Sequence, residues 1–213
     1  TLRIDHPDIE EFIYAKQDKT RLRNFNVSVL VTDGFMRAVS KNESFPLQFN
    51  GRIYKSVDAR ELWNTITKST YDVAEPGVIF IDRVNQLNPW REHETISATN
   101  PCGEQPLPPY GACLLGSMVL PKYVKNAFEI GKSALDSDAL WEDTRTAFKF
   151  LDAVIDNTYY PLPQQEVEAK TKRRIGLGIT GFADMLAMLG VRYGSDESVS
   201  YAQQVASIIA LAT

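Results

Sequence analysis

Three side chains able to do chemistry together are spaced two residues apart in a proline-rich stretch. Asn100, Cys102 and Glu104 supply an amide, a thiol and a carboxylate, and four prolines lie between Asn100 and Cys113. Because proline excludes a helix, we predict an extended backbone in which these side chains share one face, about 6–7 Å apart. Such a face could bind a polar ligand, perform hydrogen-atom or nucleophilic chemistry at sulfur, and accept a proton.

The two intervening residues would leave that face open to a ligand. Pro101 favours an extended conformation at Asn100, and Gly103 permits a close approach of another molecule to the backbone. The structural alternative for Cys102 is a small buried hydrophobic side chain. The neighbouring carboxylate of Glu104 argues against that alternative, because a carboxylate beside a packed thiol is costly unless it is paired or functional.

The second cysteine, Cys113, lies eleven positions beyond Cys102, after a Pro-Pro-Tyr-Gly turn. A hairpin-like return could bring the two sulfur atoms within several ångströms of each other. The spacing does not fit a Cys-x-x-Cys redox or zinc motif. His6 and His93 belong to no ligand pattern, so we interpret them as structural or surface residues and predict no metal site.

Alternating helices and strands must position these residues. Hydrophobic periodicity and capping signals predict the elements, and the apolar run at 78–81 indicates a strand buried on both faces of a parallel sheet. Asp82, Arg83 and Asn85 follow this strand, where α/β folds gather ligand-binding groups. The predicted elements are helices over 8–16, 33–39, 138–159, 181–189 and 196–212, a helix opened by Asp58 and Glu61 that continues through Leu62 and Ile66, and strands over 27–32 and 78–81.

This alternation predicts the α/β class. No linker-like stretch divides residues 1–213, so we expect one domain. The chain begins at Thr1 rather than at Met and ends at Thr213 within an apolar helical pattern that lacks a stop signal. We therefore expect an incomplete domain that is truncated at both ends.

Composition excludes several classes of protein. Hydrophobic residues make up 44% and charged residues 23% of the chain, and the net charge is −4, which gives no basic surface for DNA or RNA. The short basic cluster at 170–174 is interpreted as a solvated helix end. No apolar run approaches a membrane span and no signal peptide is visible. Two cysteines are too few for a secreted disulfide framework, which favours a reducing cytoplasm.

With these residues in view, the chain resembles the large, catalytic subunit of ribonucleotide reductases. Residues 100–104 resemble the radical-site motif Asn-x-Cys-x-Glu of that family, and the continuation through Cys113 to Ser117 is similar to its adenosylcobalamin-dependent class. Three further stretches, 6–13, 76–85 and 174–184, are similar to the same family in the same order. The resemblance spans nearly the whole chain.

The resemblance implies a role for each of these side chains. Cys102 would become the thiyl radical that removes the ribose 3′-hydrogen, and Glu104 would take the proton of the 3′-hydroxyl as the 2′-hydroxyl leaves as water. Asn100 would hydrogen-bond the sugar hydroxyls. Cys113 would be one half of the dithiol that supplies the electrons. The substrate-binding segment would be Asn100, Pro101, Cys102, Gly103 and Glu104.

The resemblance also implies a fold, a cofactor and partners. The chain would be a fragment of a ten-stranded α/β barrel, and the full enzyme would use adenosylcobalamin to make deoxyribonucleotides for DNA synthesis. Its partners would be a ribonucleotide substrate, a nucleoside triphosphate effector, a thioredoxin-type reductant and a second subunit in a homodimer. The polar stretch from Lys16 to Asn24, with Arg21 and Arg23, resembles the loop that relays effector identity, although an ordinary solvent loop is an equal alternative.

The sequence departs from the family pattern in three respects that bear on activity. The dithiol partner of Cys113 would lie upstream, and the chain has only two cysteines. The phosphate-binding turn and the cysteine tail of the family are also absent. We therefore expect no turnover by this chain alone.

Three alternatives remain open. The residues Gly176 to Gly181 satisfy the dinucleotide fingerprint G-x-G-x-x-G with Asp196 about 20 residues on, but the charged, helix-prone stretch 166–174 stands where an apolar strand is required. The iron- or manganese-dependent reductases share Asn-x-Cys-x-Glu, so the choice of cobalamin rests on the residues around the motif. An inactive split-gene or assembly fragment is the third alternative, and the flanking reading frame distinguishes it.

Overall fold

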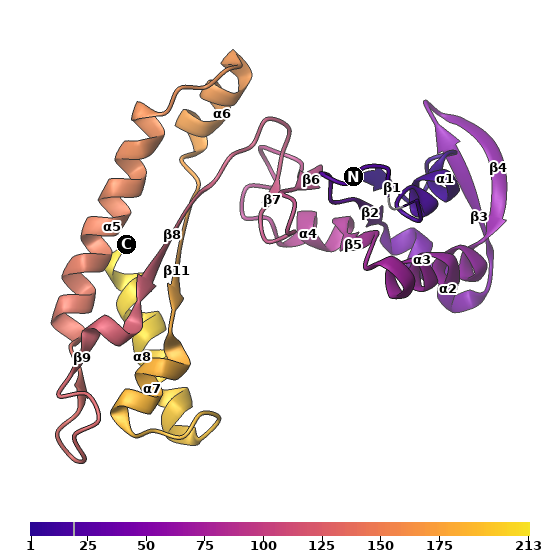
Figure 1. The fold of residues 1–213 in the computed structure, drawn as a ribbon. Helices are drawn as coiled ribbons and strands as arrows, with labels where there is room; N and C mark the ends of the chain where they lie inside the picture. The colour runs from indigo at the N-terminus through magenta and orange to yellow at the C-terminus, as the bar shows by residue number, and fades with distance from the viewer. Residues whose placement is uncertain (19) are drawn as a thin grey trace. The chain divides into compact units, whose positions relative to one another are not determined.

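The computed structural model describes residues 1–18 and 20–213, so Lys19 of the predicted effector loop lies outside the described residues. The chain separates into two compact units, Thr1–Tyr110 and Gly111–Thr213. Figure 1 shows the first unit in indigo to magenta and the second in pink to yellow. Each unit combines helices with parallel strands, which confirms the predicted α/β class.

The first unit contains four helices and seven strands among its described residues. In chain order they are β1 (Leu2–Arg3), α1 (Ile9–Tyr14), β2 (Ser28–Val31), α2 (Asp33–Lys41), β3 (Ser44–Phe49), β4 (Arg52–Asp58), α3 (Ala59–Val73), β5 (Gly77–Phe80), α4 (Ile81–Leu87), β6 (Ala98–Thr99) and β7 (Pro106–Leu107).

The central sheet of this unit has the order β1-β2-β5, and both pairings are parallel. Val29 and Val31 of β2 face a core made with α1, α2 and α3, whereas Leu30 packs on the opposite face with Ile81 and Ile96. The strand buried on both faces is therefore β2. β5 lies at the edge of this sheet, and the prediction that both faces of residues 78–81 are covered is confirmed in part, because Val78 packs against the first core and Ile79 against the second, whereas Phe80 is 44% exposed.

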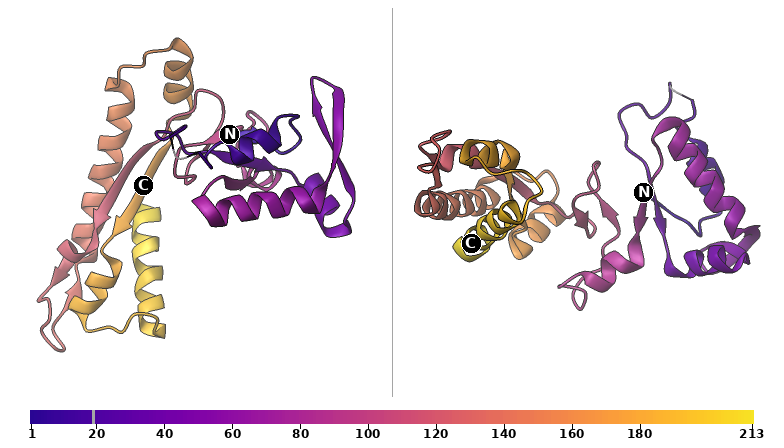
Figure 2. Two further views of the ribbon diagram at one scale, coloured as in Figure 1. Left: turned by 45° about the vertical axis from the view of Figure 1, so that its right-hand side comes forward. Right: turned by 90° about the horizontal axis from the view of Figure 1, so that it is seen from below.

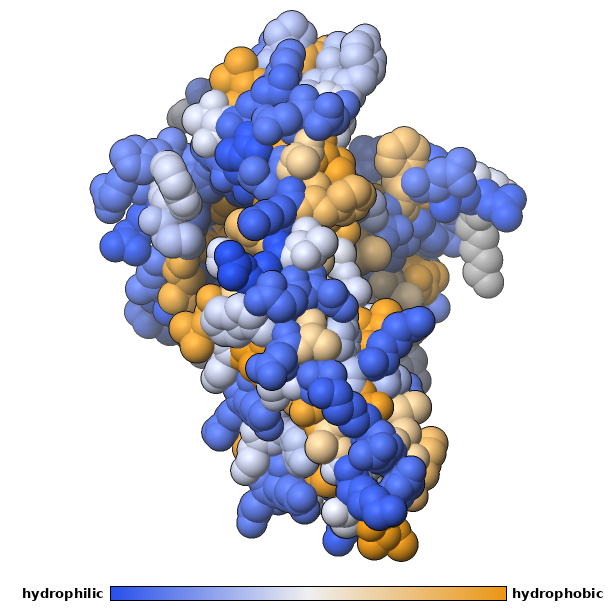
Figure 3. Space-filling view, turned by 90° about the vertical axis from the view of Figure 1, so that its left-hand side faces the viewer, coloured by the Kyte–Doolittle hydropathy of each residue, from blue (hydrophilic) through white to orange (hydrophobic). Residues whose placement is uncertain are grey.

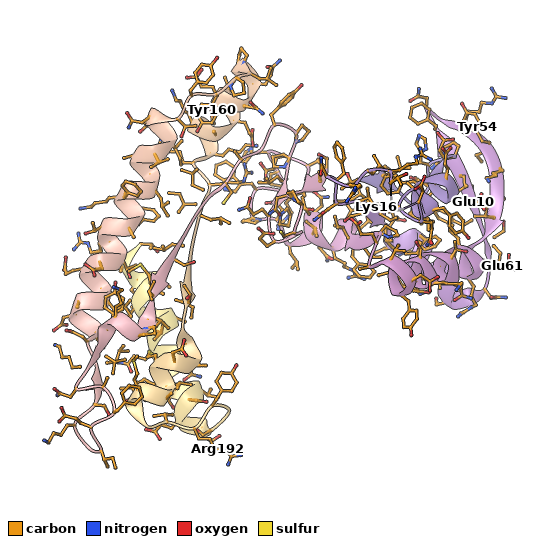
Figure 4. The ribbon with its side chains drawn as sticks, in the orientation of Figure 1. Glu10, Lys16, Tyr54, Glu61, Tyr160 and Arg192 are labelled. Atoms are coloured by element: carbon orange, nitrogen blue, oxygen red, sulfur yellow. The ribbon has the colours of Figure 1, made fainter. Side chains whose placement is uncertain are left out.

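The predicted capping residue Asp58 begins α3, and its side chain accepts a hydrogen bond from the backbone N–H of Glu61. The hairpin of β3 and β4 that precedes it was not predicted. Its strands pair from Ser44 with Asp58 to Phe49 with Arg52. Lys55 of β4 forms an ion pair with Glu10 of α1, which is labelled in Figure 4, and this pair ties the hairpin to the helical layer.

The second unit contains four α-helices, one 3-10 helix and four strands among its described residues. They are β8 (Leu114–Val119), η1 (Leu120–Tyr123), β9 (Val124–Lys125), β10 (Ala134–Leu135), α5 (Ser137–Asn157), α6 (Pro163–Lys172), β11 (Ile175–Thr180), α7 (Phe182–Leu189) and α8 (Asp196–Ala212). The helices α5, α7 and α8 confirm the helices predicted over 138–159, 181–189 and 196–212.

Two parallel strands organise the second unit. β8 pairs with β11 along six residues, from Leu114 with Ile175 to Val119 with Thr180, and Figure 2 shows α5 and α8 running beside this pair. The core joins Met118 of β8 to buried residues of α5, α7 and α8, namely Leu140, Met185, Leu186 and Val205.

The residues of the dinucleotide fingerprint lie inside this strand pair. Gly176 and Gly178 are part of β11 itself, rather than of a loop between a strand and a helix, and the helix α6 precedes them. A Cβ at Gly176 would lie 2.5 Å from Leu115 Cδ2. Packing of Leu115 against β11 therefore accounts for Gly176, and the dinucleotide alternative loses its structural basis because both glycines lie within a strand.

The outer face of the second unit is largely hydrophilic. Figure 3, which views this face, shows polar residues interspersed with small hydrophobic groups. In the part of the chain that the structure describes, no helix combines the length and the apolar character needed to cross a membrane.

A glycine at the junction of β11 and α7 generates a test of this packing. Gly181 has a φ of +74°, and a Cβ there would lie 2.6 Å from Cδ of Pro121 in η1. Gly190, at the other end of α7, has a φ of +75°, but a Cβ there would meet no atom within 4 Å. The two positions thus share the backbone conformation and differ in the space around it.

We predict that Gly181→Ala lowers the free energy of unfolding more than Gly190→Ala does. Both substitutions force a side chain into the left-handed region, at roughly 1–2 kcal/mol, and only Gly181→Ala adds overlap with a packed ring, at about 1–3 kcal/mol. Urea denaturation of the two variants and the wild type measures the difference. Equal losses would show that Pro121 does not confine this junction.

Candidate active site

The predicted reactive residues lie in a tight turn between two short strands. β6 and β7 pair antiparallel, and the loop between them closes with a hydrogen bond from Gly103 N to Asn100 O of 3.0 Å. Gly103 has a φ of +84°. The predicted extended conformation is therefore wrong here, because Pro101 suits the second position of a β-turn and Gly103 accepts a backbone conformation that other residues avoid.

Asn100 uses part of its side chain to hold this loop. Its Oδ1 accepts a hydrogen bond from the backbone N–H of Gln105 at 2.9 Å, and its own N–H donates to Gln105 O at 3.2 Å. The oxygen of this side-chain amide thus stabilises the loop. Its NH2 group takes no part in this bond and is a donor that a ligand hydroxyl could use.

The thiol and the carboxylate are both accessible. Cys102 is a free cysteine with an exposed side chain, and Glu104 is exposed two positions further along the same loop. The alternative of a cysteine packed as a small core residue is therefore excluded for Cys102. Because the turn replaces the extended segment, the three side chains lie around one loop rather than along one strand face.

A cavity of about 370 Å³ lies against this loop. Gly103 forms part of its wall, and the remaining walls come from β5, α4, β6 and β7, with Phe80 and Leu87 among the exposed apolar side chains. The lining residues are Val78, Ile79, Phe80, Arg83, Val84, Leu87, Thr99, Gly103 and Pro106. The motif thus borders a largely apolar hollow.

One residue from a distant part of the sequence contacts the turn. The side-chain amide of Asn26, which directly precedes Val27 and β2, donates a hydrogen bond of 2.9 Å to the carbonyl oxygen of Pro101. Asn26 has no sequence feature that marks it, because a single asparagine beside a strand usually serves a local turn. The contact between Asn26 and Pro101 becomes apparent only in the folded structure.

The predicted effector loop forms a second hollow of about 430 Å³. Lys16, Arg21 and Arg23 line it together with Glu75, whereas Asn24 is exposed and is not among the lining residues. Lys16 is already engaged, because its Nζ lies 2.5 Å from Glu75 Oε2 and donates to Phe25 O. A role of this loop in sensing an effector stays a prediction.

Cys113 lies at the start of the β8–β11 strand pair in the second unit. It directly precedes β8, and Leu114 N donates to Arg174 O at 3.1 Å, so Cys113 and Arg174 are neighbours at the start of the pair. A Cβ at Gly176 would lie 3.8 Å from the Cys113 sulfur. Cys102 and Cys113 belong to different units, and a pairing between them stays a prediction.

The environment of Cys113 opposes ionisation. Burial raises the pKa of its thiol above the ordinary value, and the positive charge of Arg174 counteracts that rise. Arg174 is held in turn by Glu168, whose Oε1 accepts from its Nη1 at 2.8 Å. A thiol that must exchange with a disulfide benefits from such a cation, because the thiolate is the attacking form.

The basic cluster at 170–174 lies at the end of α6 and is paired with acids. Arg173 binds Asp152 and Asp156 of α5, and its hydrogen bonds lower the pKa of both carboxyl groups. Lys170 pairs with Glu166 one turn away. This cluster therefore joins two helices of the second unit, and no basic surface for a nucleic acid arises from it.

The two histidines have local roles. The Nδ1 of His6 accepts a hydrogen bond from the backbone N–H of Asp8, and its ring packs edge-on against Phe49. His93 packs against Trp90. Within residues 1–18 and 20–213, no group of three or more His, Cys, Asp or Glu side chains is arranged to hold a metal ion.

Comparison with known proteins gives one consistent result. The family described as "Ribonucleotide reductase, barrel domain" matches residues 1–213. The chain is 42% identical over 211 residues to the vitamin B12-dependent ribonucleoside-diphosphate reductase of Thermoplasma acidophilum, covering 98% of this chain and 27% of that protein. For the protein of the same name from Mycobacterium tuberculosis the identity is 41% over 207 residues, covering 96% of this chain and 29% of the relative.

A more distant relative carries a different name. The ribonucleoside-diphosphate reductase subunit alpha of Chlamydia pneumoniae is 26% identical over 242 residues, covering 96% of this chain and 23% of that protein. The chain thus spans about a quarter of the length of the curated relatives that it matches.

We predict that Arg174→Gln slows the alkylation of Cys113. The substitution removes the cation that opposes the effect of burial, so the pKa of the thiol rises further and less thiolate is present at pH 8. Iodoacetamide labelling across a pH series, followed by mass spectrometry of each cysteine peptide, measures the shift of the Cys113 profile toward higher pH.

The matched control is Arg192→Gln, which removes an exposed arginine of the same unit, labelled in Figure 4 beyond α7. It should leave the Cys113 profile unchanged, and Cys102 serves as an internal reference in each sample. An unchanged Cys113 profile in Arg174→Gln would contradict an electrostatic role for that arginine.

Proposed function

The chain belongs to the ribonucleotide reductase family, as a part of its barrel domain, and from this membership we propose that it carries the radical site of an enzyme that reduces ribonucleotides to deoxyribonucleotides. The observation that carries the proposal is the exposed thiol of Cys102 in a tight turn that also presents Asn100 and Glu104. A radical cysteine must reach a sugar ring, and a buried one could not.

The chemistry assigns one step to each side chain. The thiyl form of Cys102 removes the 3′-hydrogen atom of the ribose, and the S–H bond forms as the C–H bond breaks. Glu104 takes the proton of the 3′-hydroxyl, the C–O bond at C2′ breaks, and the 2′-hydroxyl takes a proton from the dithiol and leaves as water. The other hydrogen of the dithiol goes to C2′, and the hydrogen atom held by Cys102 returns to C3′, which restores the thiyl form. The free NH2 group of Asn100 donates to a sugar hydroxyl and thereby orients the ring for both transfers.

The reduction also requires two electrons and two protons. A dithiol supplies them and becomes a disulfide, so that one water and one disulfide form for each ribonucleotide reduced. We assign Cys113 to this dithiol with a second cysteine from outside this chain. Arg174 supports the assignment, because its charge counteracts the effect of burial on the thiol and so favours the thiolate needed when a thioredoxin-type reductant reopens the disulfide.

The cofactor we propose is adenosylcobalamin, which supplies the radical equivalent that takes the hydrogen atom from the Cys102 thiol. Gly103 leaves open space beside the turn, because a Cβ there would meet no atom within 4 Å. The relatives support this choice over the metal-dependent class, since two relatives at 41–42% identity are named vitamin B12-dependent, whereas the subunit alpha protein is 26% identical, a value that other vitamin B12-dependent relatives share.

The remaining proposals concern the complete protein. We propose that the parallel sheets β1-β2-β5 and β8-β11 contribute strands to the ten-stranded α/β barrel of the complete protein. The enzyme works as a homodimer in the cytoplasm and binds a nucleoside triphosphate effector. The loop with Lys16, Arg21, Arg23 and Asn24 is the candidate for reading that effector, and Arg21 and Arg23 are the cations of its hollow that could bind a phosphate, beside the acidic Asp72 and Glu75.

We predict that Cys102→Ser abolishes ribonucleotide reduction by a full-length reductase that contains this chain. The substitution replaces sulfur by oxygen, and the much stronger O–H bond does not yield a radical able to continue the cycle. Because Cys102 is exposed, the thermal unfolding midpoint should stay that of the wild type. Turnover by a correctly folded Cys102→Ser protein would refute the radical role.

We also predict that the full-length enzyme reduces ribonucleotides when given adenosylcobalamin and a dithiol, with no metal-bearing partner subunit. Deoxyribonucleotide formation by the purified protein, with and without the cobalamin, measures this. Activity that appeared only with an iron- or manganese-containing subunit would assign the protein to the other class and leave the radical role of Cys102 intact.

A further inference from the structure

The turn that carries Cys102 is attached to the rest of its unit by a side chain 75 residues away. Asn26 Nδ2 donates to Pro101 O at 2.9 Å, and that carbonyl belongs to the peptide bond between Pro101 and Cys102. This peptide is the central one of the turn closed by Gly103 N and Asn100 O. The contact is therefore made at the bond that sets the direction of the cysteine.

The central peptide of a β-turn has two orientations. In type I and type II turns it points to opposite sides, and proline at the second position is compatible with both. Reversing it would rotate the Cα–Cβ bond of the following residue, here Cys102, and would require a positive φ there, which Cys102 does not have in this structure. A donor fixed in space that binds Pro101 O adds to this preference and holds the thiol in one direction.

Asn26 is such a donor because both of its chain neighbours are fixed. Phe25 O accepts a hydrogen bond from Lys16 Nζ at 2.5 Å, and Val27 N donates to Glu75 Oε1 at 2.9 Å. Lys16 and Glu75 also form an ion pair with each other, and their side chains are only 16% and 19% exposed. Figure 4 labels Lys16 within the first unit.

The ion pair is anchored to the helical layer in its turn. The hydroxyl of Ser69, which is 2% exposed in α3, lies 3.0 Å from Glu75 O and 3.1 Å from Ile13 O. Glu75 is therefore held at its backbone as well as at its carboxylate. A continuous set of contacts leads from α3 through Glu75 and Asn26 to the peptide before Cys102.

We infer that Asn26 is a positioning residue of the radical site, whose amide fixes the Pro101–Cys102 peptide and so aims the thiol at the sugar. This inference rests on the proposed function for its catalytic meaning. That Asn26 restrains the turn follows from the contacts alone and does not depend on the proposed function. The experiment therefore has one arm for each part.

The first arm measures the turn in the 213-residue chain. Asn26→Asp keeps the shape of the side chain and removes the donor, and Asn26→Ala removes the donor without adding charge. In both variants, amide hydrogen exchange at Gly103, followed by NMR, should become about fivefold faster, the effect of losing one hydrogen bond of this kind. Asn64→Asp is the matched control, because Asn64 is an exposed residue of α3 in the same unit.

The second arm measures turnover in the full-length reductase. Both Asn26 variants should lower kcat ten- to hundredfold with little change in KM, because a displaced thiol affects the reacting geometry rather than substrate binding. Asn64→Asp should leave both constants unchanged. A merely structural role would lower the unfolding midpoint and the fraction of active enzyme, and it would not alter exchange at Gly103 selectively.

The outcomes separate the two hypotheses. Wild-type exchange at Gly103 in both Asn26 variants would overturn the positioning role, whatever the effect on turnover. Faster exchange with unchanged kcat would also overturn it. If Cys102→Ser still turned over while the Asn26 variants showed faster exchange at Gly103, the proposed function would fail and the restraint of the turn by Asn26 would stand.

Discussion

Burial of β2 on both faces is the constraint on which the first unit depends. Its valines contribute to the core beneath the three helices, and Leu30 packs on the other side with Ile81 and Ile96. A strand held in this way cannot shift by one residue without reversing which side chains each core receives. The two ends of β2 are therefore fixed in position, and so are the residues that directly precede and follow the strand.

The candidate redox residue of the second unit, Cys113, depends on a different constraint. Two parallel strands, β8 and β11, pair over six residues, and at Gly176 a side chain would collide with Leu115 of β8. The close pairing places the start of β8 beside the end of α6. Cys113 and Arg174 become neighbours through this register alone, although they are far apart in sequence.

The sequence anticipated the helices far better than the short strands and turns. Amphipathic periodicity over many residues identified α5 and α8, and capping by Asp58 identified the start of α3. β11 was not predicted, because its glycines remove the alternation that marks a strand. The Asn50–Gly51 pair that closes the β3–β4 hairpin is a strong turn signal, but it lies between strands of mixed polarity.

For the candidate site, the residue types were predicted and their arrangement was not. The prolines exclude a helix and thereby suggest an extended backbone, whereas Pro101 and Gly103 together favour a turn. The contact with Asn26 depends on the fold of the whole unit and has no local signature.

The ion pair of Lys16 and Glu75 has a consequence for how this protein can vary. The same Lys16 amine donates to Phe25 O, so the two ends of the segment between Lys16 and Phe25 are held together. The length of this segment can therefore change without moving the residues on either side of it. Each doubling of the length of a closed loop costs only about 0.6 kcal/mol in chain entropy. Insertions and deletions between these two residues thus cost little free energy of folding. The loop can vary in length during evolution while the contacts at its two ends stay the same.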